Sequence, residues 1–264
     1  MPLARIRSLA VKLAIAGFVV AGAAGAQQIK TAISPAIPDA ARPLPLAAIR
    51  LTGGPLKQAQ DLDADYLLKL EPDRMMAYYR KRAGLEPKAE GYTGWDGDGR
   101  NLTGHIAGHY LSAVSLMYAA TGDPRFKERA DYIVREMKEV QDKHGDGYLG
   151  ALANGKEQFI EVSKGNIRSS GFDLNGLWSP WYVLHKTFAG LGDAYRYTGN
   201  RTALDVEIKF AAWAEGILSK LDDAQLQKML NTEFGGMTES LAELYADTGT
   251  SAGSIFRTAS TTAP

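Results

Sequence analysis

The stretch Gly94–Asp123, GWDGDGRNLTGHIAGHYLSAVSLMYAATGD, joins a glycine-rich acidic loop to a segment with helical periodicity. His105, His109 and Ser112 share one face of this helix, because positions three and four apart stack above one another. On the adjacent face, apolar residues recur with the period of an amphipathic helix that faces a core. They are Leu102, Ile106, Tyr110, Ala113 and Met117. The stretch therefore predicts a helix with a polar cluster where it leaves the loop.

The end of this stretch recurs twice farther along the chain. A tyrosine followed by Thr-Gly closes an apolar helical pattern near Tyr118, near Tyr197 and near Tyr245. Glycine suits the left-handed position just past a helix end. A partner helical pattern follows the first two copies, over 125–141 and 202–218. We therefore expect an all-α array or toroid of antiparallel helical hairpins that stops before its last hairpins.

The composition is that of an ordinary globular protein. Of 264 residues, 45% are hydrophobic and 23% are charged, and 30 basic side chains balance 30 acidic ones. A chain without net charge has no long-range field to gather phosphates, so nucleic acid is not an expected partner. The chain contains no cysteine, so an exported protein of this sequence holds its fold by packing and without disulfides.

Residues 1–26 have the features of a signal peptide. Basic residues precede the apolar run from Leu13 to Ala23, and Ala24-Gly25-Ala26 offers a cleavage site of small residues. The apolar run is too short to span a bilayer as a permanent helix. We expect a secreted or periplasmic protein that has no membrane attachment after cleavage, with a membrane anchor as the alternative.

The remaining boundaries follow from composition and periodicity. Residues 27–50 form a proline-rich lead-in, and residues 51–249 carry the helical pattern. Within that part, 151–175 show no clear period and are interpreted as a long loop, and no strand pattern is expected. Residues 250–264 form a low-complexity tail, and the abrupt change after Gly249 favours a truncated or frame-shifted reading frame.

Two groups of residues have the spacing of metal sites but lack the full ligand set. His105 and His109 are four apart, yet Ile106 stands where a zincin requires glutamate and no third ligand follows. The loop Asp96–Asn101 is similar to a calcium loop, but Arg100 occupies its fifth position. We expect structural hydrogen bonding or sugar contact for the histidines, a tight polar turn for the loop, and no metal at either.

Two further groups carry candidate functional side chains. His185 lies beside two tryptophans, just off the buried row of a helix that Ser179 and Pro180 are expected to cap. It is either presented to a cavity or hydrogen-bonded in the core. Glu233 and Glu239 flank a Gly-Gly turn, and glycoside hydrolysis usually requires paired carboxylates. The alternative for Glu239 is favourable electrostatics at a helix start.

Five motifs in series resemble the glycoside hydrolase family 127 and 146 group, the β-L-arabinofuranosidases and their relatives. They lie in order between Leu51 and Gly249 and read WDGDGRNLTGHIAGHYLSA, LMYAATGD, GDGYL, WYVLHKTFAGL and EFGGMTE. The resemblance implies an incomplete (α/α)6 toroid here and an exported enzyme that acts on arabinose-containing plant glycans at a non-reducing end. Thr238 departs from the asparagine that the family usually shows after Gly-Gly-Met.

The resemblance also implies which residues meet the substrate. We expect His109, His185 and Glu233 to contact a plant oligosaccharide or polysaccharide, with Trp95 and Glu239 as further substrate-binding candidates. The family is similar in mechanism to retaining hydrolases, with a cysteine nucleophile held on zinc by cysteines and a glutamate, and a second glutamate as acid/base. Those residues lie later in the family's chain, and this sequence has no cysteine. The zinc and the catalytic residues are therefore not assigned, and the chain is expected to be inactive.

Two other functions stay open at this point. A different toroid enzyme, such as a polysaccharide lyase or an uronyl hydrolase, would need neither zinc nor cysteine. A non-catalytic sugar-binding module built on helical hairpins would need no catalytic group at all.

Overall fold

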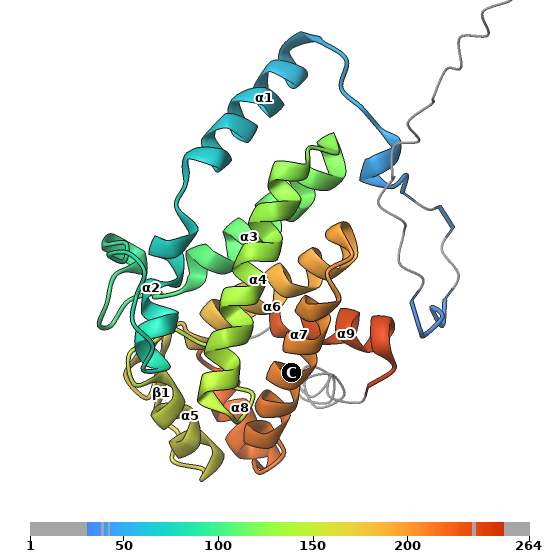
Figure 1. Ribbon diagram of the computed structural model, residues 1–264. Coiled ribbons are helices and arrows are strands. Elements are labelled where there is room, and N and C mark those ends of the chain that lie inside the picture. The colour runs from blue at the N-terminus through green and yellow to red at the C-terminus, as the bar shows by residue number, and fades with distance from the viewer. Residues whose placement is uncertain (1–30, 38–39, 42, 234–235, 251–264) are drawn as a thin grey trace, which may run out of the picture.

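The structure of the protein is a computed structural model that describes residues 31–37, 40–41, 43–233 and 236–250 (Figure 1). The expected signal peptide, 1–26, and residues 251–264 of the expected tail lie outside the described residues. The helices of the described part are η1 (Leu46–Ala48), α1 (Gly54–Lys69), α2 (Pro72–Arg82), η2 (Gly94–Asp96), α3 (His105–Thr121), α4 (Pro124–His144), α5 (Gly155–Ser163), α6 (Pro180–Thr198), α7 (Arg201–Leu218), α8 (Asp223–Leu230) and α9 (Gly236–Thr248). The strands are β1 (Ser169–Ser170), β2 (Asp173–Leu174) and β3 (Leu177–Trp178).

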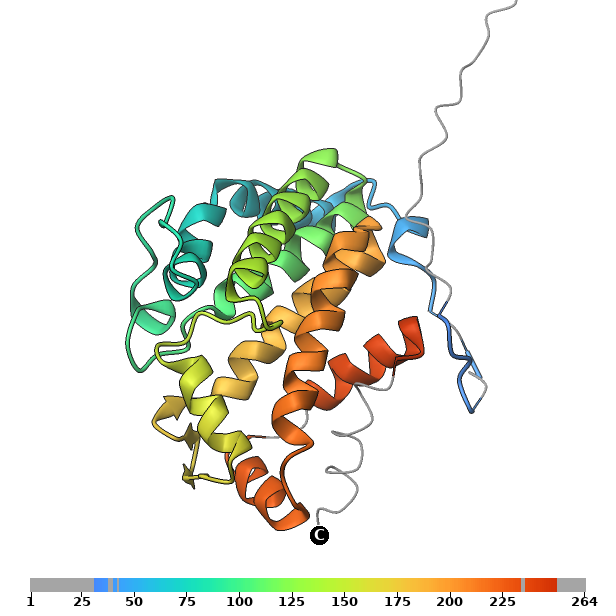
Figure 2. The same ribbon diagram turned by 60° about the horizontal axis from the view of Figure 1, so that its bottom comes forward.

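The helices pair as hairpins in two rows. One row holds α3, α6 and α9, with α3 against α6 and α6 against α9. The other holds α4 and α7, which pack on each other and on α3 and α6 respectively, as the turned view also shows (Figure 2). The expected fold class, all-α hairpins of the toroid type, is confirmed.

The helices α3, α6 and α9 run in the same direction. Near the start of the contact, a Cβ at Gly108 of α3 would touch Lys186 of α6. One turn later on both helices, a Cβ at Gly190 of α6 would touch Leu111 of α3, so the two helices are parallel. The start of α9 lies at His185 and its end lies near the end of α6, where Arg196 binds Asp247 at 2.9 Å. The starts of all three helices therefore lie on one side of the molecule.

The three predicted Thr-Gly turns share one hydrogen-bonding pattern. The last residues of α3, α6 and α9 are Thr121, Thr198 and Thr248, whose hydroxyls donate to the carbonyl four residues earlier at 2.7, 2.6 and 2.6 Å. The next residue is a left-handed glycine in each case. These are Gly122, Gly199 and Gly249, with φ of 76°, 72° and 73°. Because a side chain is strained at such φ values, glycine ends each helix and the predicted repeat is confirmed.

Two glycines let α3 and α6 touch through their backbones. A Cβ at Gly108 would lie 2.1 Å from the carbonyl oxygen of Lys186, and one at Gly190 would lie 2.7 Å from the carbonyl oxygen of Gly108. No other residue fits such a crossing without moving a helix. His109 and Lys186, which flank the contact, are consequently held close to each other.

Aromatic side chains fill the space between the two rows. The rings of Phe188 on α6 and Phe210 on α7 stack with their centres 4.2 Å apart, and Trp213 extends the stack. Such pairs bury large apolar areas, which is the main source of stability in a chain without disulfides. Among the described residues, no helix has the length and apolar character needed to cross a membrane.

The segment 151–175 differs from the loop that its sequence predicts. It contains α5 and two strands of a small antiparallel sheet, in which β1 pairs with β2 and β2 with β3. Ser169 lies opposite Leu174, and Asp173 opposite Trp178. The expectations of a loop and of no strands are wrong. A helix of nine residues and strands of two residues are too short to show a period.

Candidate functional site

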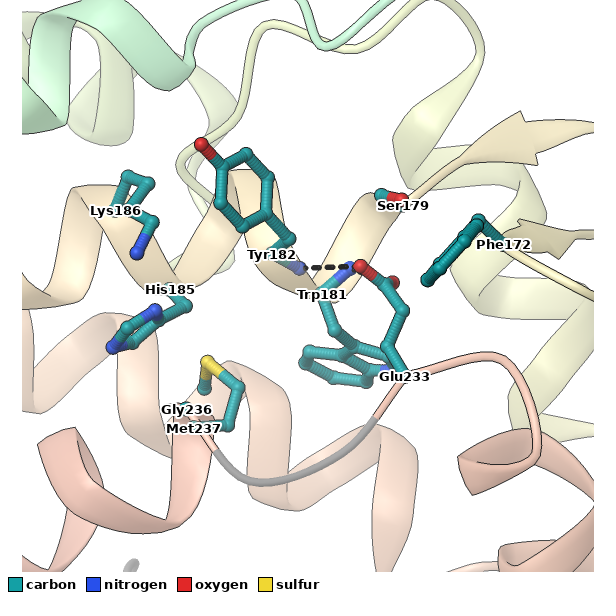
Figure 3. Close-up of a pocket in the computed structure, with 9 residues that line it drawn as sticks. All are labelled: Phe172, Ser179, Trp181, Tyr182, His185, Lys186, Glu233, Gly236 and Met237. Atoms are coloured by element: carbon teal, nitrogen blue, oxygen red, sulfur yellow. Dashed lines mark hydrogen bonds between the residues drawn. The ribbon is translucent and has the colours of Figure 1, made fainter.

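A cavity of about 330 Å³ lies where the start of α6 meets the start of α9 (Figure 3). Its volume is at the lower end of the range for small-ligand sites. It is lined by Phe172, Ser179, Trp181, Tyr182, His185, Lys186, Glu233, Gly236 and Met237. Two predicted substrate contacts from distant parts of the sequence, His185 and Glu233, thus lie in one cavity, which we call the Glu233 cavity.

Glu233 caps the start of α6. Its Oε2 accepts a hydrogen bond from the main-chain N–H of Trp181 at 2.9 Å, and its Oε1 accepts one from Tyr182 at 3.0 Å. Ser179 makes no side-chain capping bond, so the prediction that it caps this helix is wrong. Its backbone is left-handed, with φ of 44°, whereas a capping residue normally has extended geometry. The Ser179 hydroxyl instead hydrogen-bonds to Glu233.

The Glu233 carboxyl group titrates near neutral pH. Burial raises its pKa to about 7, although the hydrogen bonds from Tyr182, Trp181 and Ser179 act in the opposite direction. Burial disfavours the charged form of a carboxyl group, and hydrogen bonds alone do not restore it here. Glu233 can therefore both hold and release a proton at neutral pH, which is the property of a general acid or base.

The hydroxyl of Tyr182 joins α6 to the two histidines of α3. It lies 3.1 Å from Nε2 of His109 and 3.4 Å from Nδ1 of His105. His109 is exposed and His105 is buried. The Lys186 ammonium group lies 4.8 Å from the centre of the Tyr182 ring, a cation–π contact. The polar cluster predicted at the start of α3 is confirmed, and Tyr182 connects it to the wall of the Glu233 cavity.

Asp96 supports this cluster from the loop before α3. Its Oδ1 accepts hydrogen bonds from the main-chain N–H groups of Gly104 at 2.8 Å and Ile106 at 3.4 Å. In the described part of the chain, its buried Oδ2 and the buried Nε2 of His105 have no hydrogen-bond partner. Burial raises the pKa of Asp96 to about 6 and lowers that of His105 to about 4. The sequence predicts only a polar turn for Asp96. Its role as a cap was missed because the N–H group that it accepts, that of Gly104, lies eight residues later and matches no local capping motif.

The helix α3 begins at His105, so one residue of its predicted apolar row lies outside it. Leu102 belongs to the preceding loop and packs with Leu152 and Val183 in a small separate cluster. Gly104, just before the helix, has φ of 101°, which favours glycine. This left-handed residue stops the helix from extending back to Leu102, although Leu102 has the spacing of the helical row.

His185 presents a neutral ring to the cavity. Burial lowers its pKa to about 4, and the nearby charge of Lys186 adds to the effect. A neutral imidazole offers one donor and one acceptor, which suits the hydroxyl groups of a ligand. The start of α9 comes so near that a Cβ at Gly236 would lie 2.8 Å from Nδ1 of His185. Glycine at this position therefore leaves room for the ring.

A family model described as the β-L-arabinofuranosidase, GH127 catalytic domain, matches residues 48–252. The chain belongs to this family. The resemblance that the five motifs carry is thereby confirmed. No curated protein sequence matches the GH127 chain.

The GH127 chain is also similar to a solved structure, Ara127N-Se, a GH127 β-L-arabinofuranosidase from Geobacillus stearothermophilus T6. The sequence identity is 18% and the TM-score is 0.48, over 75% of this chain and 28% of that chain. The GH127 chain thus spans less than a third of the length of that solved structure.

Three predicted substrate-binding residues of the GH127 chain, His109, Trp95 and Glu239, are not among the lining residues of the Glu233 cavity. His109 meets that lining through its contact with the Tyr182 hydroxyl. Trp95 is 70% exposed, and its ring meets that of Trp178 edge-on with the centres 6.4 Å apart. Glu239 is exposed in the first turn of α9 and lies close enough to Lys186 to oppose the lowering of that lysine's pKa by burial. The paired carboxylates that the sequence suggests therefore do not face one cavity.

The zinc group that the family resemblance implies does not fit the residues of this GH127 chain. Its ligands would be cysteines with a glutamate, and the chain has no cysteine. Across the described ranges, no three His, Asp or Glu side chains gather closely enough to hold a metal ion.

Proposed function

We propose that this chain acts as a glycoside hydrolase domain that receives an arabinofuranosyl residue at the non-reducing end of a plant glycan. Membership of the GH127 family supports the enzyme class. The observation that carries the proposal is Glu233, a half-buried carboxyl group with a pKa of about 7 in the wall of a cavity with a neutral histidine.

The lining of the Glu233 cavity matches the two kinds of surface on a sugar. The exposed ring of Phe172 offers apolar surface against which the C–H groups of a furanose can pack. His185 and Glu233 supply polar atoms for its hydroxyl groups. A few polar groups in an otherwise apolar cavity fix the orientation of a ligand, so a single sugar residue is the expected occupant.

Glu233 is the proton-holding group of the proposed reaction. When protonated, it can donate its proton to the oxygen of the glycosidic bond as that bond breaks. In the net hydrolysis, water gives its oxygen to the anomeric carbon and a proton back to Glu233. Hydrolysis by two carboxyl groups would need a second one within about 5–10 Å. Among the described lining residues Glu233 is the one carboxyl group, so the proposal gives it proton transfer and assigns no nucleophile.

Binding and turnover of an arabinofuranoside test the proposal. The binding of methyl β-L-arabinofuranoside to the purified chain is measured by saturation-transfer NMR, with circular dichroism of the same sample. We expect binding that weakens about 10-fold or more in His185→Ala and Glu233→Gln. Stronger binding of uronate-containing oligosaccharides would favour a lyase or uronyl hydrolase and would contradict the proposal. The sequence predicts little or no turnover of p-nitrophenyl β-L-arabinofuranoside, and any turnover that the chain shows should fall about 100-fold in Glu233→Gln.

A non-catalytic sugar-binding role is the second candidate. Both carboxylate oxygens of Glu233 accept main-chain hydrogen bonds, which gives this residue a structural role in capping α6. Binding of the arabinofuranoside by a folded protein without any turnover would favour this candidate.

We further propose that the protein works outside the cytoplasm, secreted or periplasmic, where plant glycans occur. The signal-peptide features of residues 1–26 support this location. The absence of net charge supports a neutral glycan over nucleic acid as the partner.

A further inference from the structure

A second hollow, of about 340 Å³, lies beside the Glu233 cavity and has no role in the proposed reaction. It is lined by Gly99, Arg100, Asn101, Leu152, Ala153, Asn154, Gln158, Asn175, Gly176, Leu177 and Trp178. The two hollows are neighbours, because Trp178 lines this one and the next residue, Ser179, lines the Glu233 cavity. We call it the Trp178 hollow. A linear molecule could occupy both.

The side-chain amides that line the Trp178 hollow differ in how many hydrogen bonds they make within the protein. The side chain of Asn175 is fully used, since its Oδ1 accepts from the N–H of Arg168 at 2.7 Å and its Nδ2 donates to the carbonyl of Asn166 at 2.9 Å. By contrast, Asn154 makes no capping bond at the start of α5, and Gln158 lies one helical turn later on the same wall. Hydrogen bonds within the described chain leave both of these side-chain amides unused. They can bond to ligand hydroxyls.

Two tryptophans stand at the edge of the Trp178 hollow. The ring of Trp178 lines it, and the ring of Trp95 meets Trp178 at an interplanar angle of 77°. Trp95 is 70% exposed, which leaves a large apolar face in water. Ligands that have an apolar face and polar edges, as sugar rings do, can cover such a surface while their hydroxyl groups reach amides.

The charge of the Trp178 hollow is balanced. Arg100 is the charged side chain among its described lining residues, and its Nη2 lies 2.8 Å from Oδ2 of Asp173. A guanidinium group that already has a carboxylate partner offers little to an anion. Neutral ligands are therefore favoured over uronates or phosphates.

The backbone is constrained around both hollows. Within the described chain, the non-glycine residues with positive φ are Asn154 at 56°, Asn175 at 53° and Ser179 at 44°. The two asparagines line the Trp178 hollow, and Ser179 lines the Glu233 cavity. Residues held in this region cluster at binding sites because the surrounding structure must enforce them.

We propose that the Trp178 hollow, together with Trp95, is a second carbohydrate subsite that binds a neutral sugar residue of the glycan whose end lies in the Glu233 cavity. The identity of that end rests on the proposed function, whereas the binding of a neutral sugar in the Trp178 hollow does not. The subsite makes the affinity depend on the length of the glycan, because only longer chains reach both hollows.

Isothermal titration of the full chain with arabino-oligosaccharides of increasing length tests the subsite. In Trp95→Ala and Gln158→Ala, we expect about 10-fold weaker binding of the longer oligosaccharides and unchanged binding of methyl β-L-arabinofuranoside. The matched controls are Tyr66→Ala, an exposed aromatic residue on α1, and Glu157→Ala, the exposed neighbour of Gln158. Both controls should bind as the unmodified protein does. Gln158 is preferred to Asn154, whose left-handed backbone would strain an alanine.

The outcomes separate this inference from the proposed function. If His185→Ala changes nothing while Trp95→Ala still weakens oligosaccharide binding, the subsite stands and the proposed function fails. If Trp95→Ala binds every oligosaccharide as the unmodified protein does, or if no oligosaccharide binds, the subsite is overturned. Equal losses in Tyr66→Ala, or tighter binding of uronate-containing chains, would also overturn it.

Discussion

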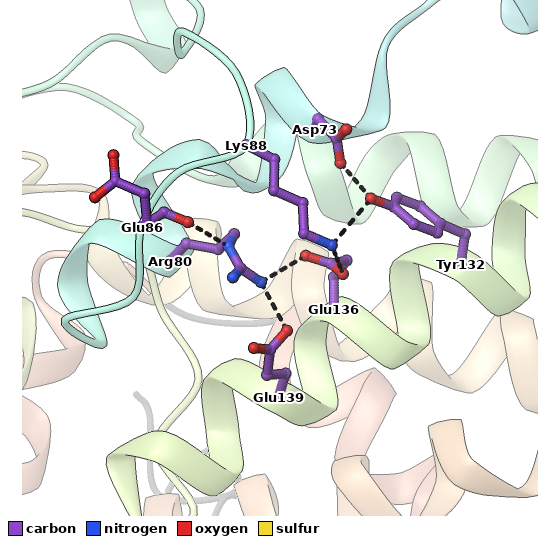
Figure 4. A network of polar contacts seen from close by, with 7 residues as sticks. All are labelled: Asp73, Arg80, Glu86, Lys88, Tyr132, Glu136 and Glu139. Carbon is purple, nitrogen blue, oxygen red and sulfur yellow. Dashed lines mark hydrogen bonds and ion pairs between the residues drawn. The ribbon is translucent and has the colours of Figure 1, made fainter.

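The Glu233 cavity and a polar network between α2 and α4 bury carboxyl groups in opposite ways (Figures 3 and 4). In the network, Nη1 of Arg80 lies 2.8 Å from Oε2 of Glu136 and 2.7 Å from Oε2 of Glu139. Lys88 lies on the other oxygen of Glu136 at 2.5 Å. In the cavity, Glu233 meets main-chain N–H groups and a hydroxyl group and its pKa is set by burial.

The difference shows how the partner of a carboxyl group decides its role. The Arg80 guanidinium lowers the pKa of Glu139, because a hydrogen bond from a cation stabilises the ionised form. Burial without a cation raises the pKa of Glu233 to about 7. The ion pairs of the network therefore serve the fold and favour the ionised form of Glu139, whereas the cavity carries a group that exchanges its proton near neutral pH.

The largest expected effect breaks the network. Arg80→Met leaves Glu136, whose side chain is 6% exposed, with Lys88 as its remaining cation, and we expect a loss of about 3 kcal/mol in the free energy of unfolding. Lys138→Met removes an exposed partner of Asp142 and should cost less than about 1 kcal/mol. Urea unfolding followed by circular dichroism measures both. A similar small loss in the two variants would mean that Arg80 is dispensable to the network.

The next effect concerns the backbone contact beneath the cavity. Gly108→Ala forces α3 and α6 apart, and we expect about 2–3 kcal/mol of lost stability together with a change around Tyr182. Gly216→Ala in α7 is the matched control, because a Cβ there meets nothing within 4 Å. It should stabilise the protein by about 0.5–1 kcal/mol. Equal thermal midpoints for the two variants would contradict the crossing described above.

The sign of the pH dependence sharpens the comparison between the two regions. Glu233 has a pKa of about 7 in the folded state against 4.5 ordinarily, so its contribution to stability is present below pH 4.5 and is lost as the pH rises through 7. From pH 8 to pH 5, the protein should gain about 2 kcal/mol relative to its Glu233→Gln variant.

Glu139 provides the opposite case. Its pKa is lowered, so its contribution is present above the ordinary pKa and is lost as the pH falls. The protein should therefore lose stability relative to Glu139→Gln on acidification below about pH 5. Unfolding curves across this pH range give both differences, and the same sign for the two glutamates would refute the contrast.

The smallest expected change in stability comes from removing the Tyr182 hydroxyl, which lies between His105 and His109. Tyr182→Phe removes the hydroxyl near His109 and His105 and should cost about 1 kcal/mol or less. In nitrogen-15 NMR spectra, the imidazole signals of these two histidines should shift. His144, which packs on Tyr148 instead, should keep its signals. A shift of all histidine signals would point to a wider change in the fold.

Local patterns made much of the fold predictable. The Thr-Gly turns and the cap of α4, where Asp123 accepts the N–H of Arg125 at 3.0 Å, depend on residues within one helical turn. The caps of α3 and α6 were not predictable, because Asp96 and Glu233 come from outside those turns, and Glu233 lies 52 residues from Trp181. His185 and Glu233 could be proposed from motifs. The role of Tyr182 could not, because its contact with the histidines of α3 depends on how α3 and α6 cross.

The common direction of α3, α6 and α9 has an electrostatic consequence for the whole cavity side. The peptide dipoles of parallel helices add rather than cancel, and the starts of helices carry the positive ends. An acidic residue lies at each of these starts: Asp96 at α3, Glu233 at α6 and Glu239 in the first turn of α9. The three carboxyl groups therefore lie in one positive field that the backbone itself supplies.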